Sequence, residues 1–123
     1  MINAKIERLA FAIKTAEGWL PEKNSLTFRN HNPGALRSSR FAIGERDNFA
    51  YFLSDDVGFV ALCFDLAMKC QGKTGTGLRP ISTLYDLIKV YTAETDPQKL
   101  ENYTLVIEKI TGLSRNIELN YFN

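Results

Sequence analysis

At 123 residues, the chain has the length of one ordinary domain and can bury a hydrophobic core without disulfide bonds. Its 15 Lys and Arg residues balance 14 Asp and Glu residues, and the two signs are interleaved, which argues against a nucleic-acid-binding surface. The longest apolar stretch, from Val57 to Met68, is interrupted by Asp65 and is too short to cross a bilayer, so we expect no membrane insertion.

No internal repeat, low-complexity tract or linker divides residues 1–123, and we expect a single domain. The N-terminal residues mix charged and apolar side chains and lack the apolar segment and cleavage site of a signal peptide. We therefore expect synthesis in the cytoplasm without a signal peptide. Cys63 and Cys70 fall in one predicted helix, and a rise of ~1.5 Å per residue puts their Cα atoms about 10 Å apart. This is too far for a disulfide bond, so we expect two buried thiols in a reducing compartment.

Apolar residues at helical spacing begin at the N-terminus of the chain. They predict a first helix over residues 3–17, which Gly18 ends in a left-handed conformation. The residues that set this spacing are Ile2, Ile6, Leu9, Ile13 and Ala16.

Residues 19–46 are rich in Asn, Pro, Gly, Ser and Arg, a composition typical of a loop. A loop of this length in a compact domain is usually either functional or disordered. Its apolar side chains favour an ordered, packed loop; they are Leu26, Phe28, Leu36 and Phe41. Residues 48–53 then predict a short strand or an extended arm.

Three more helices are predicted in the rest of the chain. Residues 55–70 follow Ser54, a good N-cap, and are apolar on nearly every side, which places this helix at the centre of the domain. A helix capped by Ser82 carries a stripe of Leu84, Leu87, Ile88 and Tyr91.

The last predicted helix spans residues 98–111 and is closed by Gly112, while the tail from Ser114 has no clear assignment. Its inward side chains are Leu100, Tyr103, Ile107 and Ile110. The predicted fold class is mainly α, with helices around a central hydrophobic helix and at most a small extended arm or β element.

Glu17 continues the buried stripe of the first helix, because it lies four residues beyond Ile13 and eleven beyond Ile6. It also lies in the last turn, where the helix dipole is negative. Burial and the dipole both disfavour the carboxylate, so both should raise the pKa of Glu17. A carboxylic acid that stays protonated near neutral pH is what a general acid for a glycosidic oxygen requires. The alternative is a helix-end Glu whose carboxylate reaches solvent along its alkyl stem.

The second unusual segment is residues 28–37, FRNHNPGALR. Asn30 and Asn32 offer donors and acceptors that suit the hydroxyl and N-acetyl groups of a sugar. Pro33 and Gly34 predict a turn that can bring backbone N–H groups close to a ligand. The alternative is a structural turn in which the Asn side chains satisfy the backbone of their own loop.

These two segments together resemble a known family. Residues 16–19, AEGW, followed by residues 29–37, RNHNPGALR, are similar to phage and mobile-element muralytic proteins, in which a helix ends at Glu-Gly and a loop of the type R-N-x-N-P-G-N-L-R follows. An aromatic arm with a glycine-containing helix at residues 49–58, and tyrosines in the last two helices, extend the resemblance over about residues 10–113. The Asn that follows Gly in the family pattern is Ala35 here, which leaves no polar side chain at that position but keeps the turn.

The resemblance implies a lysozyme-like fold in which Glu17 is the acid/base residue. It also implies that the loop lines a groove for the glycan strand of bacterial peptidoglycan, with Tyr91 or Tyr103 approaching the sugar or bracing the glutamate. The substrate-binding residues implied in this way are Asn30, Asn32, Gly34, Arg37, Tyr91 and Tyr103.

No second carboxyl group stands out, although a typical glycosidase uses two. The carboxyl groups at positions 22, 45 and 47 have no special sequence context, and those at 55 and 56 suit a helix N-terminus. We therefore expect a one-carboxyl lytic transglycosylase that cuts the β-1,4 bond between N-acetylmuramic acid and N-acetylglucosamine and forms a 1,6-anhydro product. The alternatives are a muramidase that hydrolyses the same bond, and a non-catalytic glycan-binding or virion structural module.

We expect neither a cofactor nor a metal ion. His31 is the only histidine, and the two cysteines are spaced wrongly for zinc. The expected partners are peptidoglycan and the virion or secretion-machine proteins that would deliver the enzyme to the cell wall or periplasm, with passage through a holin as another route.

Overall fold

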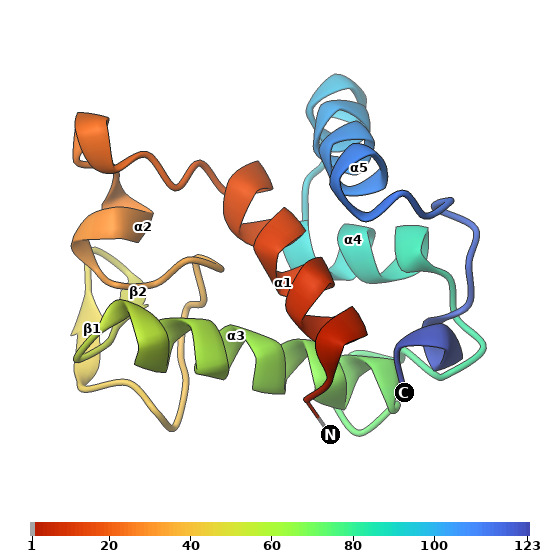
Figure 1. Ribbon diagram of the computed structural model, residues 1–123, viewed down its shortest axis with the longest axis horizontal. Helices are drawn as coiled ribbons and strands as arrows, with labels where there is room; N and C mark the ends of the chain where they lie inside the picture. The colour runs from red at the N-terminus through yellow and green to blue at the C-terminus, as the bar shows by residue number, and fades with distance from the viewer. Residues whose placement is uncertain (1) are drawn as a thin grey trace.

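The chain forms five α-helices, two short strands and two 3-10 turns in the computed structural model, which describes residues 2–123 (Figure 1). The fold is mainly helical with one small antiparallel sheet, and the predicted fold class is confirmed. Over residues 2–123, no helix combines the length and the apolar character that crossing a bilayer requires.

Helix α1 (Ala4–Ala16) begins after Asn3, whose side chain accepts a hydrogen bond from a first-turn N–H at 2.9 Å. The helix ends at Glu17, and Gly18 follows with φ at +81°. The next two N–H groups bond back to the last turn in the pattern of a Schellman motif, Gly18 to Thr15 and Trp19 to Lys14. Both the predicted helix and its left-handed end are confirmed.

The segment predicted as a loop contains three short elements, η1 (Pro21–Lys23), α2 (Leu26–Arg29) and β1 (Gly44–Arg46). Strand β1 pairs antiparallel with β2 (Phe49–Tyr51), which lies in the predicted short strand. Asp47 and Asn48 join the strands with φ at +56° and +68°, the left-handed pair typical of a tight hairpin. The sequence prediction missed β1 because its three residues have no apolar alternation; pairing and the turn hold it.

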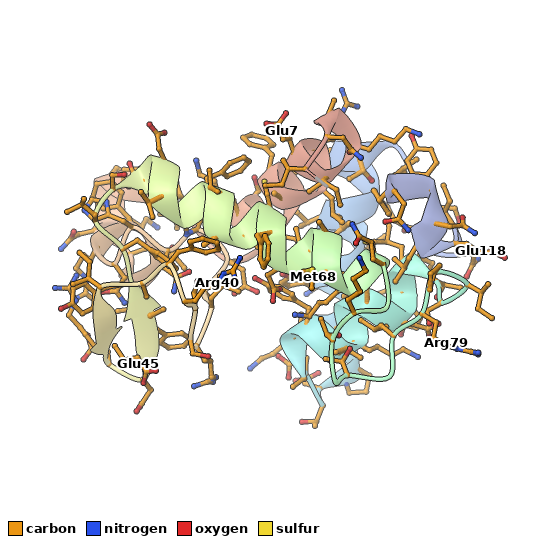
Figure 2. All side chains as sticks on the ribbon, turned by 90° about the horizontal axis from the view of Figure 1, so that it is seen from below. Glu7, Arg40, Glu45, Met68, Arg79 and Glu118 are labelled. Carbon is orange, nitrogen blue, oxygen red and sulfur yellow. The ribbon has the colours of Figure 1, made fainter. Side chains whose placement is uncertain are left out.

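Helix α3 (Asp55–Cys70) is the central helix and has the predicted bounds. Ser54 caps it, accepting a hydrogen bond from Val57 N at 3.2 Å. Only three residues of α3 are exposed: Asp55, Asp56 and Val60. Figure 2 shows α3 running along the long direction of the molecule, with Glu45 of the small sheet near one end and Arg79, which precedes α4, beyond the other.

The two cysteines of α3 are buried and free, as the sequence predicts. Burial raises the pKa of the Cys63 thiol to about 11 and that of Cys70 to about 12. Both thiols are therefore protonated and unreactive at neutral pH.

Helix α4 (Leu84–Thr92) carries the predicted stripe, but its cap is Thr83 instead of Ser82. Thr83 Oγ1 accepts from Asp86 N at 3.1 Å, and the Asp86 carboxylate accepts from Thr83 N at 3.0 Å. Ser82 accepts instead from Arg79 N at 3.0 Å. Thr83 replaces Ser82 as the cap because only Thr83 has an acidic residue three positions later, which completes a capping box.

Helix α5 (Pro97–Thr111) begins after Asp96 and ends at Gly112, which has φ at +71°. The tail folds back into η2 (Leu119–Phe122), whose Leu119 and Phe122 are buried in the core. Two apolar residues in so short an element set no period that a sequence prediction could use.

The buried side chains form two clusters with α3 between them. The larger one lies among α1, α3, α4, α5 and η2; its largest members are Ile6, Leu9, Ile13, Leu62, Leu66, Leu84, Leu87, Ile88, Ile107, Leu119 and Phe122. The smaller one joins the loop after α2, β2 and α3 through Leu36, Ala50, Phe52 and Ala61. Figure 1 shows this division, with α2 and the sheet at one end of α3 and α4 and α5 toward the other.

Candidate active site

Glu17 lies at the C-terminal end of α1, where the Schellman motif turns the chain away from the helix. The residue is partly buried, and its Oε2 accepts a hydrogen bond from the hydroxyl of Tyr103 in α5 at 2.8 Å. Burial raises the pKa of Glu17, and the Tyr103 hydrogen bond opposes part of this rise. The direction predicted from the sequence is confirmed, and desolvation is its main cause.

A cleft of about 510 Å³ opens in front of Glu17, and we call it the main cleft. It brings together parts of α1, the loop after α2, β2, α3, α4 and α5. Its lining residues are Ala16, Glu17, Ala35, Leu36, Arg37, Ser38, Phe49, Asp65, Lys69, Thr76, Val90, Tyr91, Thr92, Glu94, Lys99 and Tyr103.

A smaller hollow of about 200 Å³, which we call the side pocket, also reaches Glu17. Its lining residues are Glu17, Gly18, Ser25, Leu26, Thr27, Asn30, Asn32, Ala35 and Phe49. Three residues line both hollows: Glu17, Ala35 and Phe49. The carboxyl group therefore lies where the two hollows adjoin, a position that would let a ligand extend on both sides of it.

The predicted turn at Pro33 and Gly34 rests against the middle of the molecule. The Gly34 carbonyl accepts a short hydrogen bond from the Tyr91 hydroxyl of α4. A Cβ on Gly34 would lie 2.5 Å from both Leu62 Cδ1 and Tyr91 Oη, so any larger residue would force these side chains to move. Gly34 is buried and lines neither hollow, so its position supports a role in placing the loop.

The same loop crosses α3 at a second glycine. A Cβ on Gly58 would lie 1.8 Å from the backbone oxygen of His31, so only glycine lets the loop lie against the helix here. His31 has φ at +51°, and its Nδ1 lies 2.6 Å from Asp55 Oδ1. The loop is therefore fixed to α3 by backbone packing and a side-chain contact.

The two asparagines of the loop differ in how much of their hydrogen-bonding capacity the protein uses. Asn32 donates to Leu36 O at 2.8 Å and to Ala50 O at 2.9 Å, and its Oδ1 accepts from Leu36 N at 2.9 Å. It thus matches the structural alternative for this segment, since its amide satisfies backbone groups. Asn30 is 2% exposed, and its side-chain oxygen Oδ1 accepts from Arg46 Nε at 2.9 Å. Within residues 2–123, its Nδ2 is a buried polar atom without a partner.

The other residues singled out from the sequence line the main cleft. Arg37 is exposed, and its guanidinium lies 4.8 Å from the centre of the Phe49 ring. Tyr103 donates a hydrogen bond to Glu17. The resemblance implies such a contact for either Tyr91 or Tyr103. Tyr91 holds the turn through Gly34 and lies near Glu17, whose charge adds to burial in raising the pKa of Tyr91 well above its usual value.

Several cleft residues were not singled out by the sequence prediction. Phe49 was included only in the aromatic arm. Asp65 and Lys69 form an ion pair of 2.7 Å on the cleft side of α3, and the isolated charge at Asp65 within an apolar helix was a usable signal. Glu94 and Lys99 come from the α4–α5 connection and the start of α5, and only the packing of these helices brings them to Glu17.

No cluster of three or more His, Cys, Asp or Glu side chains in the described part of the chain is arranged to hold a metal ion. Comparisons with known protein families, with curated proteins and with solved structures find nothing that matches this chain. The site is therefore interpreted from its own geometry, and the family resemblance of the two motifs remains a prediction.

Proposed function

We propose that this protein cleaves the β-1,4 bond between N-acetylmuramic acid and N-acetylglucosamine in peptidoglycan, with Glu17 as its acid/base residue and a lysozyme-like fold. The observation that carries the proposal is the position of Glu17, a carboxyl group of raised pKa between two hollows. A polymer cut in its interior needs binding space on both sides of the reacting atoms. A carboxyl group at the junction can supply the proton that the glycosidic oxygen needs, and a raised pKa favours its protonated form.

The chemistry follows from one carboxyl group. Glu17 donates its proton to the glycosidic oxygen as the bond to C1 of N-acetylmuramic acid breaks, and the acetamido oxygen of that sugar bonds to C1. Glu17, now a carboxylate, takes the proton of the 6-hydroxyl, whose oxygen displaces the acetamido oxygen from C1. The products are a 1,6-anhydro sugar, a free 4-hydroxyl on N-acetylglucosamine and a protonated Glu17.

The Tyr103 hydroxyl supports this cycle because it donates to Glu17 Oε2. A hydrogen bond to the carboxylate stabilises the form that exists between the two proton transfers. It also fixes the orientation of the carboxyl group, which leaves Oε1 as the oxygen that faces the substrate.

A muramidase remains the second candidate because the main cleft contains two further carboxylates, Asp65 and Glu94. Asp65 is paired with Lys69, and Glu94 Oε2 accepts from the backbone N–H groups of Thr95 and Asp96. In a muramidase, one of these carboxylates would act as the nucleophile or as the base that activates water. Their existing partners make the one-carboxyl scheme the preferred one.

Mass spectrometry of purified peptidoglycan digested by the protein tests the proposal. We expect anhydro-muramic ends; ends that carry an added water would identify a muramidase instead. Glu17→Gln should lower the rate ~10²- to 10⁴-fold, as expected for loss of a general acid. Glu22→Gln, at an exposed glutamate that lines neither hollow, is the matched control. A fully active Glu17→Gln protein would rule out both enzyme candidates.

The rival from another class is a non-catalytic module that only binds glycan or builds a virion. It needs the cleft but no acid at position 17. Binding to cell walls without lysis, equally strong in wild type and Glu17→Gln, would favour this rival. For the enzyme, we propose delivery to the cell wall or periplasm by a virion, a holin or a secretion apparatus, since its substrate lies outside the cytoplasm.

A further inference from the structure

The side pocket contains an amide with an unused donor. Asn30 is 2% exposed, and no acceptor within residues 2–123 meets its Nδ2. A buried N–H group without a partner costs about 1–3 kcal/mol, so such groups are rare in folded proteins. Because Asn30 lines the side pocket, a ligand in that pocket is the available source of an acceptor.

The orientation of the Asn30 amide is fixed by the protein. Arg46 Nε donates to Asn30 Oδ1 at 2.9 Å, and Arg46 Nη2 donates to the carbonyl oxygen of Arg29 at 3.2 Å. Since a guanidinium has only donors, the atom facing it must be the amide oxygen. The amide nitrogen is therefore the unpartnered atom, and it belongs to a residue that lines the side pocket.

Apart from Glu17, the other polar side chains of the side pocket are already engaged. Thr27 Oγ1 donates to Gly18 O at 3.3 Å and lies 3.2 Å from Ser25 Oγ, which also accepts from Leu20 N at 3.0 Å. Asn32 uses both of its N–H groups on backbone carbonyls. Among the described residues that line this pocket, Asn30 Nδ2 is thus the one side-chain N–H donor without a hydrogen-bond partner.

The remaining walls of the side pocket are mostly apolar and include Leu26, Ala35 and Phe49. A matching ligand group is small, carries one carbonyl acceptor and ends in an apolar part. An N-acetyl group has this combination, whereas a hydroxyl lacks the methyl and a carboxylate would leave a second charged oxygen against apolar walls. We propose that the side pocket is an acetamido subsite, in which Asn30 Nδ2 donates to the acetyl carbonyl and the methyl group contacts Leu26 and Phe49.

This assignment rests on the proposed function and gives the glycan a direction in the site. An acetamido oxygen that accepts from Asn30 is not free to bond to C1, so the side pocket takes the sugar that does not react at C1. That sugar is N-acetylglucosamine, the leaving group. N-acetylmuramic acid, with its acidic peptide stem, then lies in the wider main cleft, which holds Arg37 and Lys99 in addition to the Asp65–Lys69 ion pair.

Binding of two tetrasaccharides tests the subsite. Isothermal titration compares the N-acetylglucosamine tetramer with its de-N-acetylated form, on protein that carries Glu17→Gln. The probes differ in charge, so the quantity of interest is the preference for the acetylated form, compared between proteins. Asn30→Asp in the same background keeps the acceptor for Arg46 but loses the donor, and should lower this preference about tenfold.

Asn116→Asp is the matched control, since it makes the same change at an exposed asparagine that lines neither hollow. It should leave the acetyl preference unchanged. An unchanged preference in a folded Asn30→Asp protein would overturn the subsite, and so would an equal loss in the control.

A second measurement needs no substitution at position 30. In ¹⁵N NMR spectra of the Glu17→Gln protein, the side-chain amide signals of Asn30 should shift when the acetylated tetramer is added and stay in place with the de-N-acetylated one. Absence of this shift while backbone signals around the main cleft move would overturn the subsite. Acetyl-dependent binding by a protein that does not lyse cell walls would instead refute the proposed function and leave the subsite standing.

Discussion

The main cleft and the side pocket meet at Glu17, but they are built in different ways. The main cleft collects charged side chains from α3, the α4–α5 connection, α5 and the loop, whereas eight of the nine side-pocket residues come from positions 17–35. The main cleft thus depends on how distant helices pack, and the side pocket depends on one local stretch. Under the proposed function, the charged main cleft suits the large, variable peptide stem. The side pocket, built from one local stretch, suits the small, constant acetyl group.

This difference also explains how much could be predicted from the sequence. Glu17 and the bounds of α1 and α3 follow from helical spacing and caps, and the turn at Gly34 follows from the Pro33–Gly34 pair; all are local signals. The separate roles of Asn30 and Asn32 could not be predicted, because they depend on Arg46 and Ala50, which reach the loop only through the hairpin. Glu94 and Lys99 join the cleft only through helix packing, for which the sequence has no local signal.

The largest expected effect comes from a change that disturbs the packing of the loop, which lines both hollows, against α3. Gly58→Ala places a Cβ 1.8 Å from the backbone oxygen of His31. A flexible side chain could move away from such a clash, but the backbone of the loop cannot. We expect a loss of about 3 kcal/mol in unfolding free energy, measured by chemical denaturation. Gly75→Ala, at a glycine with open space around it, is the control. Equal stability of the two variants would show that the loop does not rest on α3.

The next effect concerns the hydrogen bond that Tyr103 donates to Glu17. Tyr103→Phe removes the hydrogen bond to Glu17 Oε2 and should lower the lytic rate about tenfold. That hydrogen bond lowers the pKa of Glu17, so its removal raises the pKa further. Because a general acid must be protonated, the alkaline limb of the pH–rate profile should move to higher pH. Tyr85→Phe, which removes the hydroxyl of a tyrosine that lines neither hollow, is the control. If the alkaline limb of the Tyr103→Phe profile moved to lower pH, the assignment of Glu17 as the general acid would be contradicted.

A smaller effect should appear in the main cleft alone. Arg37→Gln removes an exposed cation and should weaken binding to peptide-bearing glycan about threefold, because exposed charges contribute little. Binding of the N-acetylglucosamine tetramer, which has no peptide stem, should not change. Arg40→Gln, at an exposed arginine outside both hollows, is the control. An equal loss for both ligands would contradict the division of roles between the two hollows.

The smallest effect concerns the wall that both hollows share. Ala35 has φ at +52°, a left-handed conformation that a residue with a Cβ adopts at a cost, and the family pattern has Asn there. Ala35→Gly should raise the unfolding free energy by about 0.5 kcal/mol, measured by thermal denaturation. Ala16→Gly, at a helical position, should lower it. If both changes destabilise the protein, the loop is not strained at Ala35.

The most direct test of the whole account is the titration of Glu17 itself. Its side-chain carboxyl carbon can be followed by ¹³C NMR as the pH is raised, with the exposed Glu22 as an internal comparison. We predict a midpoint above 4.5 for Glu17, caused by burial between the two hollows. A midpoint at or below 4.5 would contradict the claim that this carboxyl group is held in its protonated form, and with it the assignment of Glu17 as a general acid.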